Sequence, residues 1–333
     1  MALDDRPVLV APDSFKGTLS AQQVAAAIGR GLARAGLAAD LAPVADGGEG
    51  TMGILLERLG GETITVRAHD PLGREIEASF ALLTDGRTAV VEVAAASGLA
   101  LIGPAERDAE AASSAGTGEL IAAALARGST HVLVAAGGSA TTDAGRGALE
   151  AIEAAGGLRG ARLTVLCDVR TPFERAAEVF APQKGADGAA VARLRRRLEA
   201  FGLPRNVPMT GAAGGLAGGL WARLDASLVA GAPAVLDAID FDARMLASRA
   251  VVVGEGRLDT TSLEGKIVAE VATRARQRGV PAHAIVGRCE LDRFDARILD
   301  VQAILEAGDE PAIESAAAAL ADVIAARPLR SQR

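Results

Sequence analysis

Short apolar runs that end in polar, glycine-bearing segments alternate with helical patterns along this 333-residue chain, and this alternation most constrains its fold. Residues 7–12 form the first apolar run, and a helical pattern with Ser20 as its N-cap follows. Residues 40–45 form the second run, which ends in Asp-Gly-Gly-Glu-Gly-Thr and leads into a helical stretch at 52–59. A succession of strand, polar loop and helix is typical of an α/β fold with a parallel sheet.

The segment between residues 63 and 99 departs from this alternation. Strand-like patterns at 63–66, 76–83 and 88–93, with a turn at 85–86, predict an antiparallel meander that begins a second domain. The alternation then returns. Later strands are predicted at 131–136, 163–167, 250–254, 283–286 and 303–305, and later helices at 116–127, 143–155, 190–201, 215–224, 266–278 and 313–326.

Composition and charge argue against several classes of protein. Half of the residues are apolar, which excludes a disordered chain, and the formal net charge of −7 without a long Lys/Arg run argues against nucleic-acid binding. Cys167 and Cys289 cannot form a disulfide framework, and no Cys or His spacing indicates zinc. The chain shows no signal-peptide pattern and no apolar stretch long enough to span a bilayer, so we expect a cytoplasmic protein without a membrane partner.

Polar, glycine-bearing clusters follow several predicted strands, at the edge where open α/β sheets bind ligands. The cluster at 13–20 places a carboxylate and Lys16 just before a helix N-terminus, where backbone N–H groups favour anions; a surface loop with a helix cap is the alternative. The cluster at 46–51 combines three glycines with Asp46 and Glu49, whose oxygens suit Mg²⁺. A glycine-rich turn that caps the next helix is the alternative there.

Three further clusters complete the set. Glycines and hydroxyl groups at 137–145 could cradle phosphate oxygens, although they form neither a Walker A nor a G-x-G-x-x-G motif; a plain helix entrance is the alternative. At 167–172, Asp168 could take a proton from a hydroxyl, with an Asx-turn as the alternative. Residues 254–266 concentrate Glu, Arg, Asp and Lys after a valine-rich strand. Acids, lysines and anion-cradling loops together predict phosphoryl transfer.

Eight motifs, in order along nearly the whole chain, resemble those of the type I glycerate kinases. The resemblance implies a flavodoxin-like, doubly wound α/β domain built from residues 1–62 and 248–333, with a second α/β domain, residues 63–247, inserted between them. The segment at 156–162 is shorter than is usual in that family. The motifs lie at 11–17, 43–51, 93–99, 137–141, 166–169, 180–185, 211–215 and 254–259.

The resemblance also implies ATP-dependent phosphorylation of D-glycerate, usually at the 2-hydroxyl. Its expected partners are ATP, Mg²⁺ and D-glycerate, and a homodimer is an open possibility. A non-catalytic sensor of a sugar acid or nucleotide, and a kinase for another small hydroxy acid, are the alternative functions.

We assign candidate site residues by chemical role. Asp168 is the expected general base because it has no acidic neighbour and precedes Arg170, whereas Asp46 beside Glu49 is better suited to a cation; Asp46 stays the alternative base. The catalytic candidates are Asp168, Asp46 and Lys16, and the metal candidates are Asp46, Glu49 and Glu255. The substrate-binding candidates are Asp13, Ser14, Arg257 and Asp259, and those for nucleotide phosphates are Gly137, Gly138, Ser139, Thr141, Gly47 and Gly48.

Overall fold

The computed structural model describes residues 5–15, 17–264 and 266–326, and the chain divides into two compact units. One unit, here called the terminal unit, comprises the chain up to residue 45 and from residue 235 onward. The other, the central unit, comprises residues 46–234. The domain boundaries predicted at 62/63 and 247/248 stay predictions. Among the described helices, none is long and apolar enough to cross a membrane.

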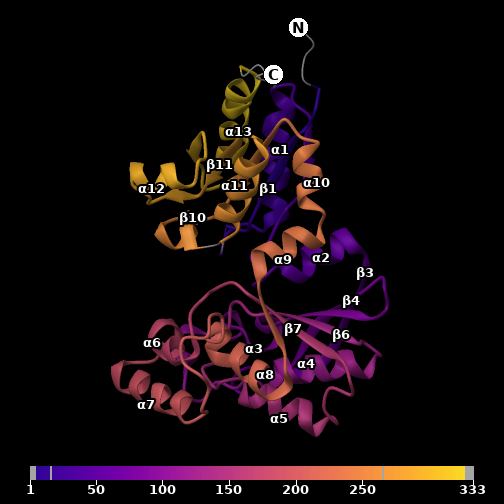
Figure 1. Ribbon diagram of the computed structural model, residues 1–333, viewed down its shortest axis with the longest axis vertical. Helices are drawn as coiled ribbons and strands as arrows, with labels where there is room; N and C mark the ends of the chain where they lie inside the picture. The colour runs from indigo at the N-terminus through magenta and orange to yellow at the C-terminus, as the bar shows by residue number, and fades with distance from the viewer. Residues whose placement is uncertain (1–4, 16, 265, 327–333) are drawn as a thin grey trace. The chain divides into compact units, whose positions relative to one another are not determined.

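The terminal unit contains a five-stranded, all-parallel sheet in the order β2-β1-β9-β11-β13. Figure 1 shows indigo segments from the start of the chain and orange to yellow segments from its end together in this unit. Strand β1 pairs directly with β9, with Val8 opposite Ala250, so segments from both ends of the chain share one sheet. The strands are β1 (Val8–Pro12), β2 (Ala39–Leu41), β9 (Ala250–Gly254), β11 (Ala282–Val286) and β13 (Ile304–Glu306), with a separate parallel pair, β10 (Arg257–Leu258) and β12 (Arg288–Cys289).

Both faces of this sheet are buried at its three central strands, β1, β9 and β11. Val8 and Val252 share a core with helices α1 and α13, while Leu9 and Val251, of opposite parity, are also fully buried. Burial on both faces explains why these strands are continuous runs of Val and Ala. The helices are α1 (Ala21–Arg34), α10 (Phe241–Leu246), α11 (Ile267–Arg278), α12 (Arg293–Ile298), α13 (Glu310–Ala325) and the 3₁₀ turn η6 (Thr260–Glu264); α9 (Gly231–Ala238) crosses the boundary between the units.

The central unit contains a six-stranded mixed sheet in the order β3-β4-β5-β6-β7-β8. The pairs β3–β4 and β4–β5 are antiparallel, which confirms the predicted meander, and β5 to β8 are parallel. The chain is therefore a mixed α/β fold, with one all-parallel sheet and one sheet that is parallel from β5 to β8. The strands are β3 (Gly61–His69), β4 (Glu75–Leu83), β5 (Thr88–Glu92), β6 (His131–Ala135), β7 (Arg162–Cys167) and β8 (Ser227–Ala230).

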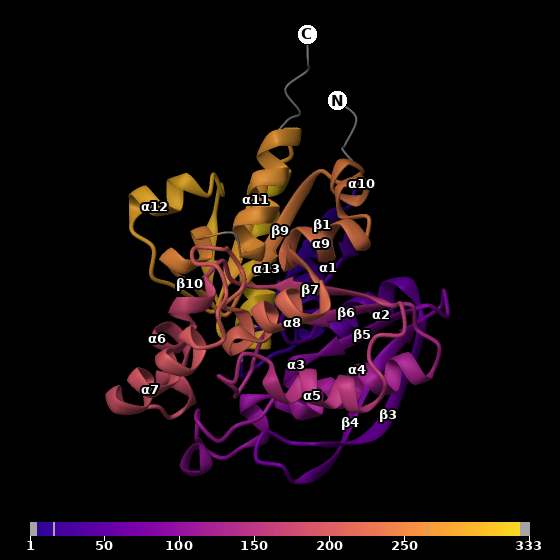
Figure 2. The same cartoon turned by 60° about the horizontal axis from the view of Figure 1, so that its bottom comes forward.

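Helices α4, α5 and α8 share one core with this sheet, and α2 packs against β4 and β5. Helices α6 and α7 lie side by side in a smaller cluster around Phe173 (Figure 2). The helices are α2 (Thr51–Leu59), α3 (Val93–Ser97), α4 (Ala115–Ala126), α5 (Arg146–Ala154), α6 (Ala176–Phe180), α7 (Gly188–Glu199) and α8 (Leu216–Leu224). The 3₁₀ turns are η1 (Leu99–Leu101), η2 (Pro104–Glu106), η3 (Phe173–Arg175), η4 (Pro182–Lys184) and η5 (Ala212–Gly215).

Candidate functional site

Polar residues of the central unit gather where three neighbouring parallel strands end. In the sheet register, Glu92 of β5 lies opposite Ala135 of β6, which lies opposite Leu166 of β7. The loop that starts at Gly137 and the carboxylate Asp168 follow these strands directly. Because parallel strands end at a common edge, these groups lie at one edge of the sheet.

The loop at 46–50 packs closely on the start of the 137–142 loop, and only glycines permit this approach. A Cβ atom on Gly137 would lie 2.5 Å from the Cα of Gly48, and a Cβ atom on Gly47 would lie 2.5 Å from the Cα of Gly231. Gly47 also has a φ of +93°, a left-handed conformation that other residues rarely adopt. The glycines therefore bring two polar loops into direct backbone contact.

Carboxylates border the space that these glycines leave open. A Cβ atom on Gly48 would lie 3.0 Å from Asp46 Oδ1 and 3.7 Å from Asp168 Oδ2, and one on Gly138 would lie 3.6 Å from Glu49 Oε2. Asp46 is buried, and its Oδ1 accepts a hydrogen bond from the N–H of Gly48 at 3.0 Å. The backbone of the 46–50 loop thus fixes one acid beside the other two.

Glu92 adds a fourth carboxylate at this edge. Its Oε1 accepts a hydrogen bond from the backbone N–H of Met52 at 2.7 Å, near the start of α2. Burial raises the pKa of Glu92, and the nearby negative charge of Glu49 raises it further. Glu92 therefore ties the start of α2 to the end of β5.

The 137–142 loop carries buried hydroxyl groups and accepts hydrogen bonds from a buried cation, Lys184 of η4. Lys184 Nζ donates hydrogen bonds to Ser139 Oγ at 2.8 Å and to the Thr141 carbonyl at 2.6 Å. Burial lowers the pKa of Lys184 to about 7, against the opposing effect of the charges on Asp143 and Asp168. The Thr141 and Thr142 hydroxyls are fully buried and make no hydrogen bond within the described part of the chain. Such hydroxyls can serve a bound oxyanion.

The terminal unit has its own pair of buried acids. Pro12 of β1 lies opposite Gly254 of β9, so Asp13 and Glu255 leave neighbouring strands at the same edge. Asp13 Oδ1 accepts a hydrogen bond from the N–H of Ser14 at 2.6 Å. Both residues are less than a tenth exposed.

Arg257 of the terminal unit is held between two acids. Its Nε lies 3.0 Å from Glu290 Oε2 and 3.4 Å from Asp259 Oδ2. Hydrogen bonding from Thr261 is the largest of the influences that lower the pKa of Asp259. A ligand carboxylate that bound this guanidinium would have to compete with both partners.

Comparison with known proteins decides the family. The family model described as "Glycerate kinase family" matches residues 8–156 and 152–327. The chain belongs to the glycerate kinase family. Glycerate kinase of Bacillus subtilis is 37% identical, covering 86% of each chain, and glycerate 2-kinase of Escherichia coli is 35% identical, covering 84% of each. A crystal structure provisionally named glycerate kinase 2 from Salmonella typhimurium LT2 matches with a TM-score of 0.80 and 30% identity, covering 96% of this chain and 98% of that one.

In this glycerate kinase family member, the predicted site residues fall into two groups. The central unit brings together the glycines of both loops with Asp46, Glu49, Ser139, Thr141 and Asp168. The terminal unit holds Asp13, Ser14, Glu255, Arg257 and Asp259. Lys16 lies outside the described residues. The assignments of role stay predictions.

The metal prediction can be tested against the carboxylates present. Among the described residues, no group of three or more His, Cys, Asp or Glu side chains is arranged to hold a metal ion. Mg²⁺, however, is commonly held by one or two carboxylates together with substrate phosphates and water. Asp46 and Glu49, in one short loop beside the glycines, fit that smaller requirement.

Lys184 is a residue of this site that the sequence alone does not identify. Residues 180–185 resemble a family motif, but the sequence alone assigns no role to the lysine within it. The available signal was compositional, because Lys184 is one of only three lysines in a chain with 35 basic residues. Glu92 was missed as well, since it appears as the last residue of an ordinary strand.

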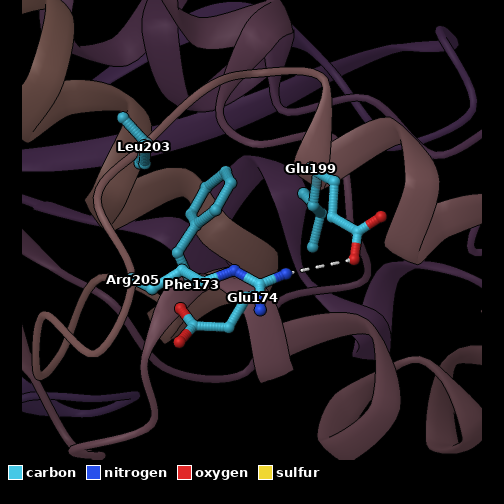
Figure 3. A pocket seen from close by; sticks show the side chains of 6 residues that line it. Phe173, Glu174, Glu199, Leu203 and Arg205 are labelled. Atoms are coloured by element: carbon cyan, nitrogen blue, oxygen red, sulfur yellow. Dashed lines mark ion pairs between the residues drawn. The ribbon is translucent and has the colours of Figure 1, made fainter.

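A separate cavity of about 310 Å³ lies in the α6–α7 part of the central unit (Figure 3). It contains none of the predicted site residues, and its one ion pair joins Arg205 to Glu199 at 3.5 Å. Its lining mixes apolar and charged side chains. The residues that line it are Phe173, Glu174, Leu198, Glu199, Leu203 and Arg205.

Proposed function

We propose that this protein is a glycerate 2-kinase, which transfers the γ-phosphoryl group of ATP to the 2-hydroxyl of D-glycerate. The observation that carries the proposal is the meeting of the 46–50 and 137–142 loops beside Asp168, at the carboxyl edge of β6 and β7. Such a site offers backbone N–H groups, hydroxyls and carboxylates with little else, which suits phosphoryl transfer. Relatives named glycerate kinase and glycerate 2-kinase support the choice of acceptor.

We further propose that the terminal unit is a flavodoxin-like, doubly wound domain into which the central unit is inserted. Its strand order, β2-β1-β9-β11-β13, corresponds to 2-1-3-4-5 when its strands are numbered by themselves, which is the flavodoxin-like order. Burial on both faces of the sheet supports the same assignment. A cytoplasmic location and a homodimer stay predictions.

In the proposed reaction, Asp168 orients the 2-hydroxyl of D-glycerate and accepts its proton. The hydroxyl oxygen forms a bond to the γ-phosphorus while the bond from that phosphorus to the ADP oxygen breaks. Gly47, Gly48 and the 137–141 segment supply backbone and hydroxyl groups to the phosphates, with Lys16 as an additional cation. Asp13, Ser14, Arg257 and Asp259 are the proposed groups for the glycerate.

Asp46 and Glu49, with Glu255 as a third candidate, are the residues proposed to hold Mg²⁺. When bound, the ion would neutralise negative charge on the phosphate oxygens. The same pair of acids also explains why Asp168 is preferred as the base, because a carboxylate that holds a cation is a poorer proton acceptor.

Identification of the product tests the proposal. The protein is incubated with ATP, Mg²⁺ and D-glycerate, and enolase with phosphoenolpyruvate detection reports 2-phosphoglycerate directly. We expect a signal without added phosphoglycerate mutase. A signal only after the mutase is added would move the reaction to the 3-hydroxyl. Binding of ATP and glycerate without release of ADP would favour a sensor, and turnover only with another hydroxy acid would change the substrate.

A further inference from the structure

Lys184 is a buried cation whose hydrogen-bond partners carry no negative charge. Only 2% of the residue is exposed, and both of its hydrogen-bond acceptors, Ser139 Oγ and the Thr141 carbonyl, are neutral. Within the described ranges, no carboxylate forms an ion pair with it. Asp143, one of the two acids whose charge it senses, already accepts hydrogen bonds from Ser114 and Gly147.

An ammonium group can only donate hydrogen bonds, and this fixes the roles of its partners. When Lys184 is charged, Ser139 Oγ accepts from it, so the Ser139 proton points away from the ammonium group and is available to another acceptor. The Thr141 carbonyl also accepts a hydrogen bond from Lys184, and this bond holds the loop backbone in place two residues after Ser139. Lys184 therefore sets both the conformation of the 137–142 loop and the donor character of its first hydroxyl.

The choice of lysine is informative in this chain. The chain has 35 Lys and Arg residues, of which only Lys16, Lys184 and Lys266 are lysines, so arginine is the ordinary cation here. A guanidinium has five donors in a rigid plane, whereas an ammonium is compact and has three donors. A buried position with two close acceptors suits the compact group.

We propose that Lys184 is a positioning residue for phosphate binding, which orients Ser139 and the 137–142 loop and gains its missing counter-charge from the bound phosphate. This inference rests on the proposed nucleotide-binding role of the loop. Asp143 and Asp168 are the acids whose charges reach Lys184, and the backbone of Arg107 packs against Gly185, the next residue along the chain.

Protonation follows from this arrangement. In the free protein, burial holds the pKa of Lys184 near 7, so part of the population is uncharged at neutral pH. A phosphate anion nearby favours the charged form and raises that pKa. Nucleotide binding at pH 7.5 should therefore draw a fraction of a proton per site from the buffer.

The experiment uses isothermal titration calorimetry with a non-hydrolysable ATP analogue and Mg²⁺, in two buffers of different ionisation enthalpy. We expect the wild-type protein to take up roughly half a proton more than Lys184→Met does, because the substituted side chain cannot titrate. Arg196→Met is the matched control, because it removes a positive charge from an exposed position on α7. Its proton uptake should equal that of the wild-type protein. Circular dichroism and thermal unfolding check that each variant is folded.

Kinetics supply a second readout that a merely structural role would not give. If Lys184 acts through Ser139, the losses of kcat in Lys184→Met and Ser139→Ala should not multiply in the double variant. Multiplicative losses, or equal proton uptake in wild type and Lys184→Met, would overturn the inference. If Lys184→Met does not fold, absence of proton uptake by the wild-type protein overturns it alone. A wild-type protein that binds no nucleotide would instead refute the proposed function, and the inference with it.

Discussion

At the scale of single residues, Asp168 and Asp46 are the two acids whose roles most need separating, because both border the same glycines. We expect Asp168→Asn to lower kcat by about 10²-fold or more, the range typical of losing a general base, with little change in the KM for ATP. Steady-state assay of ADP release measures both constants. Asp225→Asn is the matched control, since it makes the same chemical change at an exposed position of the central unit.

The reverse pattern would exchange the assignments. Near-normal kcat in Asp168→Asn together with collapse in Asp46→Asn would make Asp46 the base. The expected outcome for Asp46→Asn is different, because a residue that holds Mg²⁺ should show a raised requirement for the ion. A titration of activity against Mg²⁺ concentration distinguishes the two roles.

Lys184 also predicts a pH dependence of stability. Its pKa is about 7 in the folded protein and about 10.5 when exposed, so between these values the unfolded chain holds a proton that the folded chain has lost. Its contribution to the free energy of unfolding therefore rises with pH across that window. Below pH 7 the full cost of burying the charge is present.

The measurement compares wild type with Lys184→Met by urea unfolding at several pH values. Between pH 7.5 and 9.5 the free energy of unfolding of wild type should rise by about 1 kcal/mol per pH unit more than that of the variant, close to the limit for one proton. Parallel pH profiles would show that Lys184 titrates outside this range.

At the scale of elements, hydrophobic pattern predicted most strands and helices but not every boundary. The helix expected over 143–155 begins only at Arg146, because Ala144 and Gly145 have φ values of +62° and +72° and cannot be helical. The pattern does not predict strand β8 or helix α9, since four residues give too little alternation and Gly231-Ala-Pro233 resembles a break. Such local backbone conformations depend on tertiary packing rather than on pattern.

The contact between the two glycine loops yields a prediction at this scale. Gly137→Ala would place a Cβ atom 2.5 Å from the Cα of Gly48, and because that neighbour is backbone, one loop must shift. A displacement of about 1 Å at a reacting centre can cost about 10²-fold in rate, so we expect kcat/KM to fall by that order. Activity assays on the folded variant measure the loss.

Gly188→Ala serves as the control for that substitution. Gly188 begins α7, and a Cβ atom there would meet nothing within 4 Å. Its kcat/KM should stay at the wild-type value, and its stability should hold or rise slightly because alanine favours the helix. Equal activity in the Gly137 and Gly188 variants would show that the loop contact does not position the site.

At the scale of the whole molecule, the order of the motifs predicts which distant segments share a domain, and hydrophobic periodicity does not. Val8 pairs with Ala250 across more than two hundred intervening residues, and no local pattern specifies such a partner. The resemblance to the glycerate kinases, not the hydrophobic pattern, supplied the expectation that both chain ends build one domain. Neither the hydrophobic pattern nor the resemblance predicts the side-chain environment of Lys184, because its burial depends on how the turn at 182–185 packs against distant loops.

Segments from both ends of the chain share one core, and this leads to a last prediction, which concerns α13. Leu320 is fully buried in the core that α13 shares with α1, β1 and β9, whereas Val323 on the same helix is 47% exposed. Leu320→Ala should lower the free energy of unfolding by about 2–5 kcal/mol, since it removes buried methyl groups and leaves a cavity. Val323→Ala should change it by no more than about 0.5 kcal/mol. Urea unfolding measures the free energy of unfolding of both variants. Hydrogen exchange should show lost protection in β1 and β9 for Leu320→Ala only. Similar destabilisation by the two substitutions would mean that α13 does not hold the two ends of the chain together.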